Sequence, residues 1–518
     1  LRTELGRVNR EIERLRRLAD DSSAGLQQRD VAQQQLADLE SPSGKLSVLK
    51  MRLAGKMIAS ATCPNCGNVM KLIEGEGPSV TYDARYPSYN GDRILVDKFA
   101  YDFREPNRWD VIVFKYPEGA NTNYIKRLVG LPNELVSIAG GDIWTSRDGQ
   151  PATIARKPPH VMQAMLQVVH DSNFPASLMQ TEEWPSAWTD WADTSVWKPE
   201  RGRRQFTTTC SAGQSASLRY QRFNPTSDDW KEIRLGMGVR KDVRPALVKD
   251  FQAYNAISQG GHWVGDLAVE CAFESESDSG RIVLDLVDGG QQHSCSINLT
   301  DGTATLVAAS GEKASTLTPI KGKGSWEVLF TNVDDELRLF VDRKLMPTAI
   351  PVVWTSDIEK EATRDPRLDV VQPGSATPSD LAPVGITVKA EEEPVSVTVS
   401  SIKVLREIFY IGAVGFGRRG EIRDEAILEF PLEADQFFVL GDNSAASKDG
   451  RLWIDVHYLA TYGDGIPSRD GHPPYIGRVA IALMAKLRED EVYPVGQVAC
   501  LPDGYEVKSR TDHVTAKS

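Results

Sequence analysis

Alternation of apolar and polar positions is the main pattern in this chain. It is clear in residues 265–273 (GDLAVECAF) and 281–287 (RIVLDLV), and residues 109–116 (WDVIVFKY) form a run of β-branched and aromatic residues. Successive side chains of a strand point to opposite faces, so a two-residue period predicts strands with one buried face. Gly, Asp, Asn and Pro separate these runs, as turns require. The pattern therefore predicts a mainly β protein.

The longest set of such runs covers residues 256–407. Within it, residues 326–342 (WEVLFTNVDDELRLFVD) predict a hairpin whose turn region is residues 332–336. Regular strands separated by turn residues indicate an antiparallel β-sandwich. The strand–Asp-Asp–strand–Asp pattern resembles the laminin-G/concanavalin-like jelly roll, and a glycan or a protein is the ligand that such a module would take.

A smaller set of strand-like runs lies before this region, at residues 93–99, 109–116, 124–129 and 134–139. Residues 130–133 (GLPN) form a turn between the last two runs. Short strands at this spacing predict a small, coiled β-sheet unit.

Residues 151–255 have a mixed pattern that is rich in tryptophan. Trp184, Trp188 and Trp191 are spaced by three to four residues, which predicts one face of a helix. We expect these rings to pack in a core or between domains, although aromatic rings also suit a sugar-binding platform.

Residues 1–40 have a helical period instead. Leu5, Val8, Ile12 and Leu15 fall on one stripe, with charged residues around it. This pattern predicts a short N-terminal helical arm whose role is structural packing.

The composition excludes some classes of protein. A net charge of −12 argues against a nucleic-acid partner, because binding phosphates requires a basic face. No run reaches the roughly 18–20 apolar residues that a membrane span needs, and the longest candidate is residues 479–485 (VAIALMA). The first residue is Leu1 rather than Met, so we expect a fragment or a processed form.

Among the six cysteines, only Cys63 and Cys66 have a meaningful spacing. Gly67 after the second cysteine lets the backbone curl so that its amides face the thiolates. A tetrahedral structural zinc site needs four ligands, and no second pair lies nearby. We therefore expect half of a zinc site whose partner pair lies upstream of Leu1, with a disulfide or an idle pair as alternatives.

Lys126 is the main candidate for catalysis. A lysine can activate a serine nucleophile only while its amine is neutral, and burial among apolar groups favours the neutral form. Alternation along residues 124–129 places Lys126 on the same face as Tyr124 and Leu128, with Arg127 on the other face. This arrangement predicts a desolvated base, and a surface Lys-Arg pair is the alternative.

Four segments together resemble a known family. Residues 91–101 (GDRILVDKFAY), 109–117 (WDVIVFKYP), 124–132 (YIKRLVGLP) and 438–451 (FVLGDNSAASKDGR) resemble, in this order, motifs of type I signal peptidases, which are serine–lysine endopeptidases. The resemblance covers roughly residues 88–145 and 408–455. The C-x-x-C element and the long insert are similar to the enlarged signal peptidases of planctomycete-type bacteria.

This resemblance divides the chain into six parts. A signal peptidase-like coiled β-sheet domain is interrupted by the inserted β-sandwich. The parts are a helical arm (1–60), the C-x-x-C knuckle and linker (61–90), the first part of the peptidase-like domain (91–150), the Trp-rich insert (151–255), the sandwich insert (256–407) and the second part of the peptidase-like domain (408–518).

The resemblance also implies roles for individual residues. Lys126 would be the general base, and Ser447 would hydrogen-bond to its amine. Asp449 and Arg451 would form an ion pair that braces the loop, while Asp442 and Asn443 would form the turn after Gly441. The sequence departs from the family at Gly450, where serine is usual, at Ser444, where arginine is common, and at Asn133, where glycine is usual. The first two changes would loosen the loop, whereas Asn tolerates a positive φ.

The nucleophilic serine is not evident. The family places it in a Ser-Met-x-Pro-Thr type segment before the Gly-Asp-Arg motif, and no such segment exists here. Ser88 is too close to Gly91 and is expected to be a turn residue, while Ser41, Ser43 and Ser60 lack the motif. We expect the serine to lie before Leu1; loss of the serine and of activity is the alternative.

The expected function is removal of signal peptides from exported precursors at the outer face of the cell membrane. The resemblance implies preprotein signal peptides as substrates, an anchor upstream of residue 1, and no required cofactor beyond the zinc considered for Cys63 and Cys66. The alternatives are a catalytically silent scaffold that works through its sandwich, and a lectin-like module supported by the peptidase fold.

Overall fold

The structure is a computed structural model of the 518-residue chain. The residues that it describes are 12–17, 19, 33, 36, 60–74, 81–82, 94–97, 99–115, 123–191, 196–237, 242–251, 261–351, 358–369, 379–414, 423–424, 427–447, 449–452, 499–500 and 506–507. Contacts within the chain define two compact units. The first contains residues 1–94, 225–237 and 251–261, and the second contains the rest.

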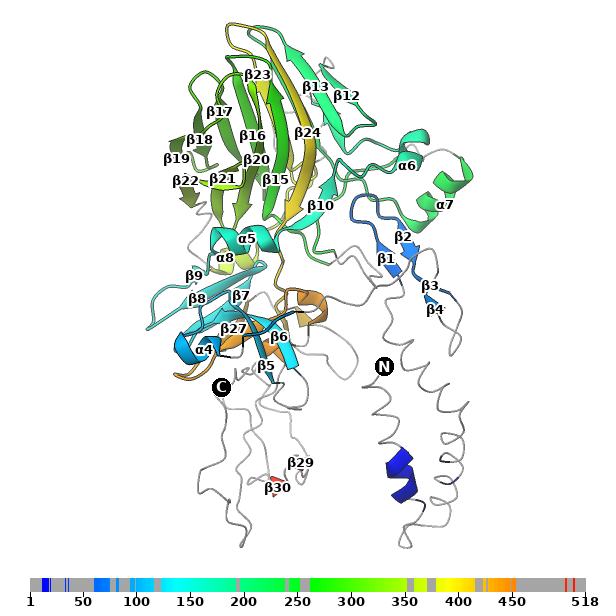
Figure 1. Cartoon of the computed structure of the whole chain (residues 1–518), viewed down its shortest axis with the longest axis vertical. Coiled ribbons are helices and arrows are strands. Elements are labelled where there is room, and N and C mark those ends of the chain that lie inside the picture. The colour runs from blue at the N-terminus through cyan, green and yellow to red at the C-terminus, as the bar shows by residue number, and fades with distance from the viewer. Residues whose placement is uncertain are drawn as a thin grey trace. The chain divides into compact units, whose positions relative to one another are not determined.

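The protein is mainly β, and half of the strands in its described residues form a sandwich in the second unit (Figure 1). One sheet has the order β12-β13-β24-β15-β20-β21-β22, with β10 also paired to β24. Its strands are β10 (Gln167–Asp171), β12 (Trp197–Glu200), β13 (Gln205–Cys210), β15 (Leu267–Ser275), β20 (Gly324–Val333), β21 (Glu336–Val341), β22 (Lys344–Pro351) and β24 (Val395–Arg406).

The second sheet of the sandwich has the order β11-β14-β23-β16-β17-β18-β19. All of its paired neighbours are antiparallel. Its strands are β11 (Trp188–Asp190), β14 (Ser215–Tyr220), β16 (Arg281–Asp288), β17 (Gln291–Asn298), β18 (Thr303–Val307), β19 (Lys313–Leu317) and β23 (Val384–Lys389). Alternating burial along β17 and β18 shows that one face of this sheet lies against the core, which confirms the predicted sandwich.

The predicted hairpin is present. β20 and β21 pair from Val333 opposite Glu336 to Val328 opposite Val341. Asp334 and Asp335 form the two-residue turn between them, both with positive φ (52° and 51°). Two left-handed residues are what a type I′ hairpin turn requires, and aspartate tolerates that conformation.

A second β domain is built from both sides of the insert, and we call it the split domain. Its four-stranded sheet has the order β27-β7-β8-β9, and its three-stranded sheet has the order β28-β6-β5. The strands are β5 (Val111–Lys115), β6 (Asn123–Gly130), β7 (Leu135–Ala139), β8 (Asp142–Ser146), β9 (Thr153–Ile154), β27 (Ile427–Pro431) and β28 (Phe438–Leu440). Because β27 pairs with β7 and β28 with β6, the sandwich is an insertion within one domain.

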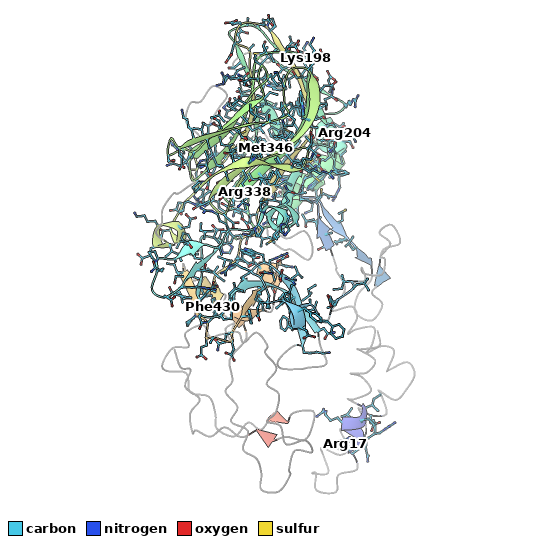
Figure 2. All side chains as sticks on the ribbon, turned by 60° about the vertical axis from the view of Figure 1, so that its left-hand side comes forward. Arg17, Lys198, Arg204, Arg338, Met346 and Phe430 are labelled. Atoms are coloured by element: carbon cyan, nitrogen blue, oxygen red, sulfur yellow. The ribbon has the colours of Figure 1, made fainter. Side chains whose placement is uncertain are left out.

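Each domain has its own apolar core (Figure 2). Met346 belongs to the cluster between the sheets of the sandwich, and Phe430 belongs to the core of the split domain. Phe430 stacks on Phe438 with ring centroids 4.1 Å apart, so the core of the split domain joins β27 to β28.

Short helices connect these sheets. In the second unit they are α4 (Ala100–Phe103), α5 (Pro159–Met165), α6 (Ser177–Thr181) and α8 (Ile358–Ala362), with the 3₁₀ turns η2 (Ser444–Ala446) and η3 (Gly450–Leu452). Two-residue strands form the pairs β25 (Ala413–Val414) with β26 (Arg423–Asp424), and β29 (Ala499–Cys500) with β30 (Glu506–Val507). No helix among the described residues has the length and apolar character needed to cross a bilayer.

The first unit contains small strands and one capped helix. The strand pairs are β1 (Ser60–Thr62) with β2 (Val69–Lys71), and β3 (Ile73–Glu74) with β4 (Thr81–Tyr82). Helix α7 (Ser227–Leu235) begins with a capping box between Thr226 and Asp229 and ends at left-handed Gly236. Residues 12–17 are helical, with Ile12 and Leu15 buried, and Leu5 and Val8 lie outside the described residues.

Three expectations need correction. Residues 94–97, predicted as part of a strand, have no regular secondary structure. The tryptophans at 184, 188 and 191 do not share a helix, because Trp188 lies in strand β11. Trp184 and Trp188 are buried, however, as core packing requires. The sandwich also begins before residue 256, since residues 167–220 supply strands β10 to β14 to its two sheets.

Candidate functional site

Lys126 lies in β6, the central strand of the three-stranded sheet. It stands opposite Ile112 of β5. On the other side of β6, Arg127 pairs with Leu440 and Leu128 with Val439 of β28. The chain after β28 therefore begins beside Lys126, although it comes from the far side of the insert.

The side chain of Lys126 is half-buried, and its amine forms a hydrogen bond with a serine. Lys126 Nζ donates a hydrogen bond of 2.6 Å to Ser447 Oγ, 321 residues later in the sequence. Nζ also lies 5.4 Å from the ring centroid of Tyr124, as the shared strand face predicted. Burial lowers the pKa of Lys126, outweighing the opposing charge of Asp449. The geometry therefore holds a lysine whose neutral form is more accessible than in water.

The loop of residues 441–451, which we call the serine loop, brings Ser447 to Lys126. Gly441 N donates to Asp449 Oδ2 at 2.9 Å, so the two ends of the loop are tied together. A Cβ on Gly441 would lie 2.0 Å from Ser447 Oγ and 3.2 Å from Lys126 Nζ. Glycine at this position is therefore what leaves room for Ser447 beside the amine.

Asp449 and Arg451 form a buried ion pair at the end of the serine loop. Arg451 Nη2 donates to Asp449 Oδ2 at 2.8 Å, and the side chains are 3% and 0% exposed. The guanidinium also donates to Ile411 O at 2.7 Å and to Ser444 O at 2.7 Å. A buried pair survives only when further hydrogen bonds satisfy it, and these carbonyl oxygens provide them.

Arg127 and Asp442 form a second pair that the sequence did not reveal. Arg127 Nε and Nη2 donate to the two carboxylate oxygens of Asp442 at 2.9 and 2.7 Å. Arg127 is on the face opposite Lys126, as expected, but it is only 11% exposed rather than a free surface residue. The two partners are 315 residues apart in the sequence, so no local pattern pairs them. The signal that the sequence offered was the position of Arg127 next to Lys126 in a predicted strand, where a buried guanidinium would require an acidic partner.

Asn443, Ser444 and Gly450 belong to the serine loop, and Asn133 lies in the turn between β6 and β7. Asn443 directly precedes η2, and Ser444 Oγ accepts hydrogen bonds from Ile411 N (2.8 Å) and Arg451 Nη1 (3.0 Å). Gly450 is buried, and a Cβ there would lie 2.6 Å from Phe438. Asn133 has φ +61°, which confirms that asparagine tolerates the position usually taken by glycine.

The serines considered as nucleophiles do not belong to the described residues of the second unit, which contains Lys126. Ser60 lies in β1 of the first unit. Ser41, Ser43 and Ser88 lie outside the described residues. The hydroxyl that contacts Lys126 in the described part of the chain is that of Ser447.

Cys63 and Cys66 form a knuckle in the first unit. Gly67 has φ +63°, and its N–H donates to Cys63 O at 2.9 Å. A hydrogen bond from the Cys66 thiol, with further ones from the amides of Cys66 and Asn65, lowers the pKa of Cys63 to about 6. Trp230 of α7 donates to Cys66 O at 3.0 Å. A lowered pKa favours the thiolate form of Cys63, which is the form that binds metals, and the zinc half-site stays a prediction.

Part of the chain matches a known family. Residues 78–180 match the family model described as Signal peptidase, peptidase S26. This segment contains Lys126 and ends before the serine loop. Signal peptidase I of Pseudomonas fluorescens is 48% identical over 58 residues, which are 9% of this chain and 20% of that protein. Signal peptidase I of Leptolyngbya laminosa is 33% identical over 88 residues, 16% of this chain and 43% of that protein.

The chain therefore spans less than half the length of these relatives. Among solved structures, the carbohydrate binding module CBM66 from Bacillus subtilis is similar over 42% of this chain and 95% of that module, with 10% identity and a TM-score of 0.23.

Proposed function

We propose that this chain is a signal peptidase I-like serine endopeptidase in which Lys126 is the general base. The observation that carries the proposal is the 2.6 Å hydrogen bond from the half-buried Lys126 amine to Ser447. The matched family segment, which contains Lys126, and the relatives named signal peptidase I support it.

In the proposed reaction, a serine hydroxyl attacks the scissile carbonyl of a preprotein. Neutral Lys126 takes the hydroxyl proton and later gives it to the leaving amine, so that an acyl-enzyme forms and is then hydrolysed. Ser447 orients the amine, while the Asp449–Arg451 and Arg127–Asp442 pairs hold the serine loop and β6 in register. We propose that the nucleophilic serine lies outside the residues that the structure describes.

We also propose that the split domain works at a membrane surface. Large apolar side chains of residues 95–125 are exposed, among them Leu95, Phe99, Phe103, Val111 and Ile125. Ile125 is the neighbour of the proposed base in β6. Exposed apolar groups of this kind are typical of surfaces that contact membranes or partners, and a membrane-anchored precursor would present its cleavage site there.

A processing assay tests the assignment of Lys126. In the full-length protein in membranes, Lys126→Ala and Lys126→Arg should abolish cleavage of a secreted precursor, because neither side chain can act as a neutral amine base. Lys115→Ala changes an exposed lysine of the neighbouring strand β5 and is the matched control. Processing by Lys126→Ala that equals processing by Lys115→Ala would refute the proposed role of Lys126, whereas no processing by the unaltered protein would favour the catalytically silent scaffold.

A further inference from the structure

Buried acidic side chains gather where the sandwich meets the split domain. They come from the start of β8, from the chain before β15, from the ends of β16 and β24, from the β20–β21 turn and from α8. They are Asp142, Asp266, Asp288, Asp334, Asp335, Glu361 and Glu407. Among the described residues, the ion pairs of these carboxylates come from two bases, Lys157 and Arg364. Burying this much unbalanced negative charge is costly.

One group of three acids contains its own cation. Oxygens of Asp142, Asp334 and Glu407 lie within 4.8 Å of one another. Lys157 Nζ lies 2.5 Å from Asp334 Oδ1 and also contacts Glu407. Lys157 is 1% exposed, so a buried ammonium occupies this group.

The second group consists of Asp266, Asp288 and Asp335, and its cation among the described residues is the guanidinium of Arg364, which lies at one side of the group. Its oxygens also lie within 4.8 Å of one another, and each residue has an Oδ1 without a hydrogen-bond partner among the described residues. Arg364 Nη1 donates to Asp288 Oδ2 at 2.8 Å but is 3.9 Å from Asp335 Oδ1. The backbone N–H of Asp334 holds Asp266 Oδ2 at 2.8 Å. Asp266 and Asp288 are thus each held through Oδ2, while the Oδ1 atoms of all three carboxylates have no hydrogen-bond partner among the described residues.

Asn332 adds a neutral oxygen to this group. It is 0% exposed, and its Nδ2 donates to Asp288 Oδ2 at 3.1 Å, which places the amide head at the cluster. Its Oδ1 has no hydrogen-bond partner among the described residues. A buried amide oxygen without a donor is costly, and a cation would satisfy it.

We propose that Asp266, Asp288 and Asp335, together with the amide oxygen of Asn332, bind a Ca²⁺ ion at the base of the sandwich. Ca²⁺ takes oxygen ligands at about 2.3–2.6 Å, so ligands on opposite sides of the ion lie up to about 5 Å apart. The 4.8 Å limit within the triad fits that sphere. All donors are oxygens, which does not favour zinc or copper.

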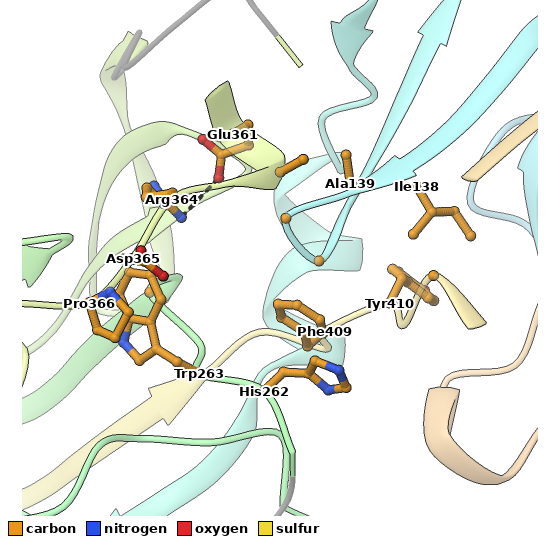
Figure 3. A pocket seen from close by; sticks show the side chains of 15 residues that line it. Ile138, Ala139, His262, Trp263, Glu361, Arg364, Asp365, Pro366, Phe409 and Tyr410 are labelled. Atoms are coloured by element: carbon orange, nitrogen blue, oxygen red, sulfur yellow. Dashed lines mark ion pairs between the residues drawn. The ribbon is translucent and has the colours of Figure 1, made fainter. Parts of the chain in front are cut away.

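A pocket lies next to the site (Figure 3). The pocket has a volume of ≈ 370 Å³, and its lining includes Gly265, Glu361 and Arg364. Gly265 directly precedes Asp266, and a Cβ on Gly265 would lie 2.1 Å from Asp288 Oδ1. Glycine therefore leaves room for the inward carboxylate.

Direct titration of the full chain tests the proposal. After treatment with EGTA and dialysis, calorimetric titration with CaCl₂ should show saturable binding at one site, and Ca²⁺ should raise the Tm by several degrees because it binds only the folded chain. Asp335→Asn removes one charged ligand at nearly constant shape. It should weaken Ca²⁺ binding by at least about tenfold and reduce the Tm increase.

Two further measurements sharpen the result. Asp278→Asn is the matched control, because this aspartate lies on the same sandwich with 74% of its side chain exposed, and it should leave Ca²⁺ binding unchanged. Asp266→Asn replaces Asp335→Asn if the latter does not fold. Absence of saturable Ca²⁺ binding at millimolar concentration, binding of Mg²⁺ alone, or equal affinity in Asp335→Asn and Asp278→Asn would overturn the proposal.

Discussion

At the scale of single residues, the protonation of Lys126 determines the expected pH dependence. A base must be unprotonated, so cleavage should rise with pH and level off above the pKa of Lys126. Burial lowers that pKa below its ordinary value of 10.5, so the midpoint should lie below 10.5. The measurement is kcat/KM against pH for a preprotein substrate. A rate that falls as pH rises through the neutral range would contradict a lysine base.

Ser447 is expected to position the amine rather than to react. Ser447→Ala removes the acceptor of the 2.6 Å hydrogen bond, and loss of such a bond should reduce kcat roughly 10- to 100-fold with KM little changed. Ser310→Ala, in an exposed turn of the sandwich, is the control. An unchanged kcat, or a rise in KM alone, would show that Ser447 does not orient Lys126.

At the scale of elements, the serine loop depends on the close approach of Gly441. Gly441→Ala would place a methyl group 2.0 Å from Ser447 Oγ, so the loop must shift away from β6. Overpacking of this kind costs about 1–3 kcal/mol, and kcat should fall at least about tenfold. Gly261→Ala is the control, since nothing lies within 4 Å of its added Cβ. Thermal melting and kcat of both variants check the prediction, and wild-type kcat in Gly441→Ala would contradict it.

Most of the strands could be predicted from the sequence, whereas their first and last residues depend on which other strands they pair with. Residues 111–115 and 123–130 form strands as their alternation indicated, and the β20–β21 turn falls within the predicted range. Residues 94–97 have the same apolar character but form no strand. The tryptophan spacing suggested a helix, yet β11 pairs with β14 and buries Trp188 in a sheet. Pairing and burial override local propensity in such short segments.

At the scale of the whole molecule, Lys157 joins the sandwich to the chain that returns to the split domain. It contacts Asp334 in the β20–β21 turn and Glu407 after β24. Lys157→Met would leave buried carboxylates without their cation, which costs about 3–5 kcal/mol of unfolding free energy.

The loss of unfolding free energy in Lys157→Met should depend on pH, because the buried carboxyl groups beside Lys157 titrate. Burial, and after it the charge of Asp334, raises the pKa of Glu407, while Lys157 lowers it. Without the lysine, the folded state holds a carboxyl group whose pKa is raised further, and such a group loses stability as pH rises. Urea unfolding should therefore show a larger deficit for Lys157→Met at pH 8 than at pH 5. Lys323→Met, which removes an exposed lysine, should change little, and equal deficits for the two variants would refute this role.

The local features of this protein follow from its amino-acid sequence alone: the strand periodicity, the two-aspartate hairpin turn, and the Lys126 and Gly441–Arg451 motifs. These features depend on neighbouring residues, so a single sequence contains them. The contacts between distant segments, in contrast, become known only from the folded structure. β28 pairs with β6 across the insert, Asp442 meets Arg127, and three aspartates from separate elements converge at the base of the sandwich. Such contacts form because folding buries the apolar strands, and a charged group that is buried with them is stable only when it is paired. The local sequence does not show which distant residue provides the partner.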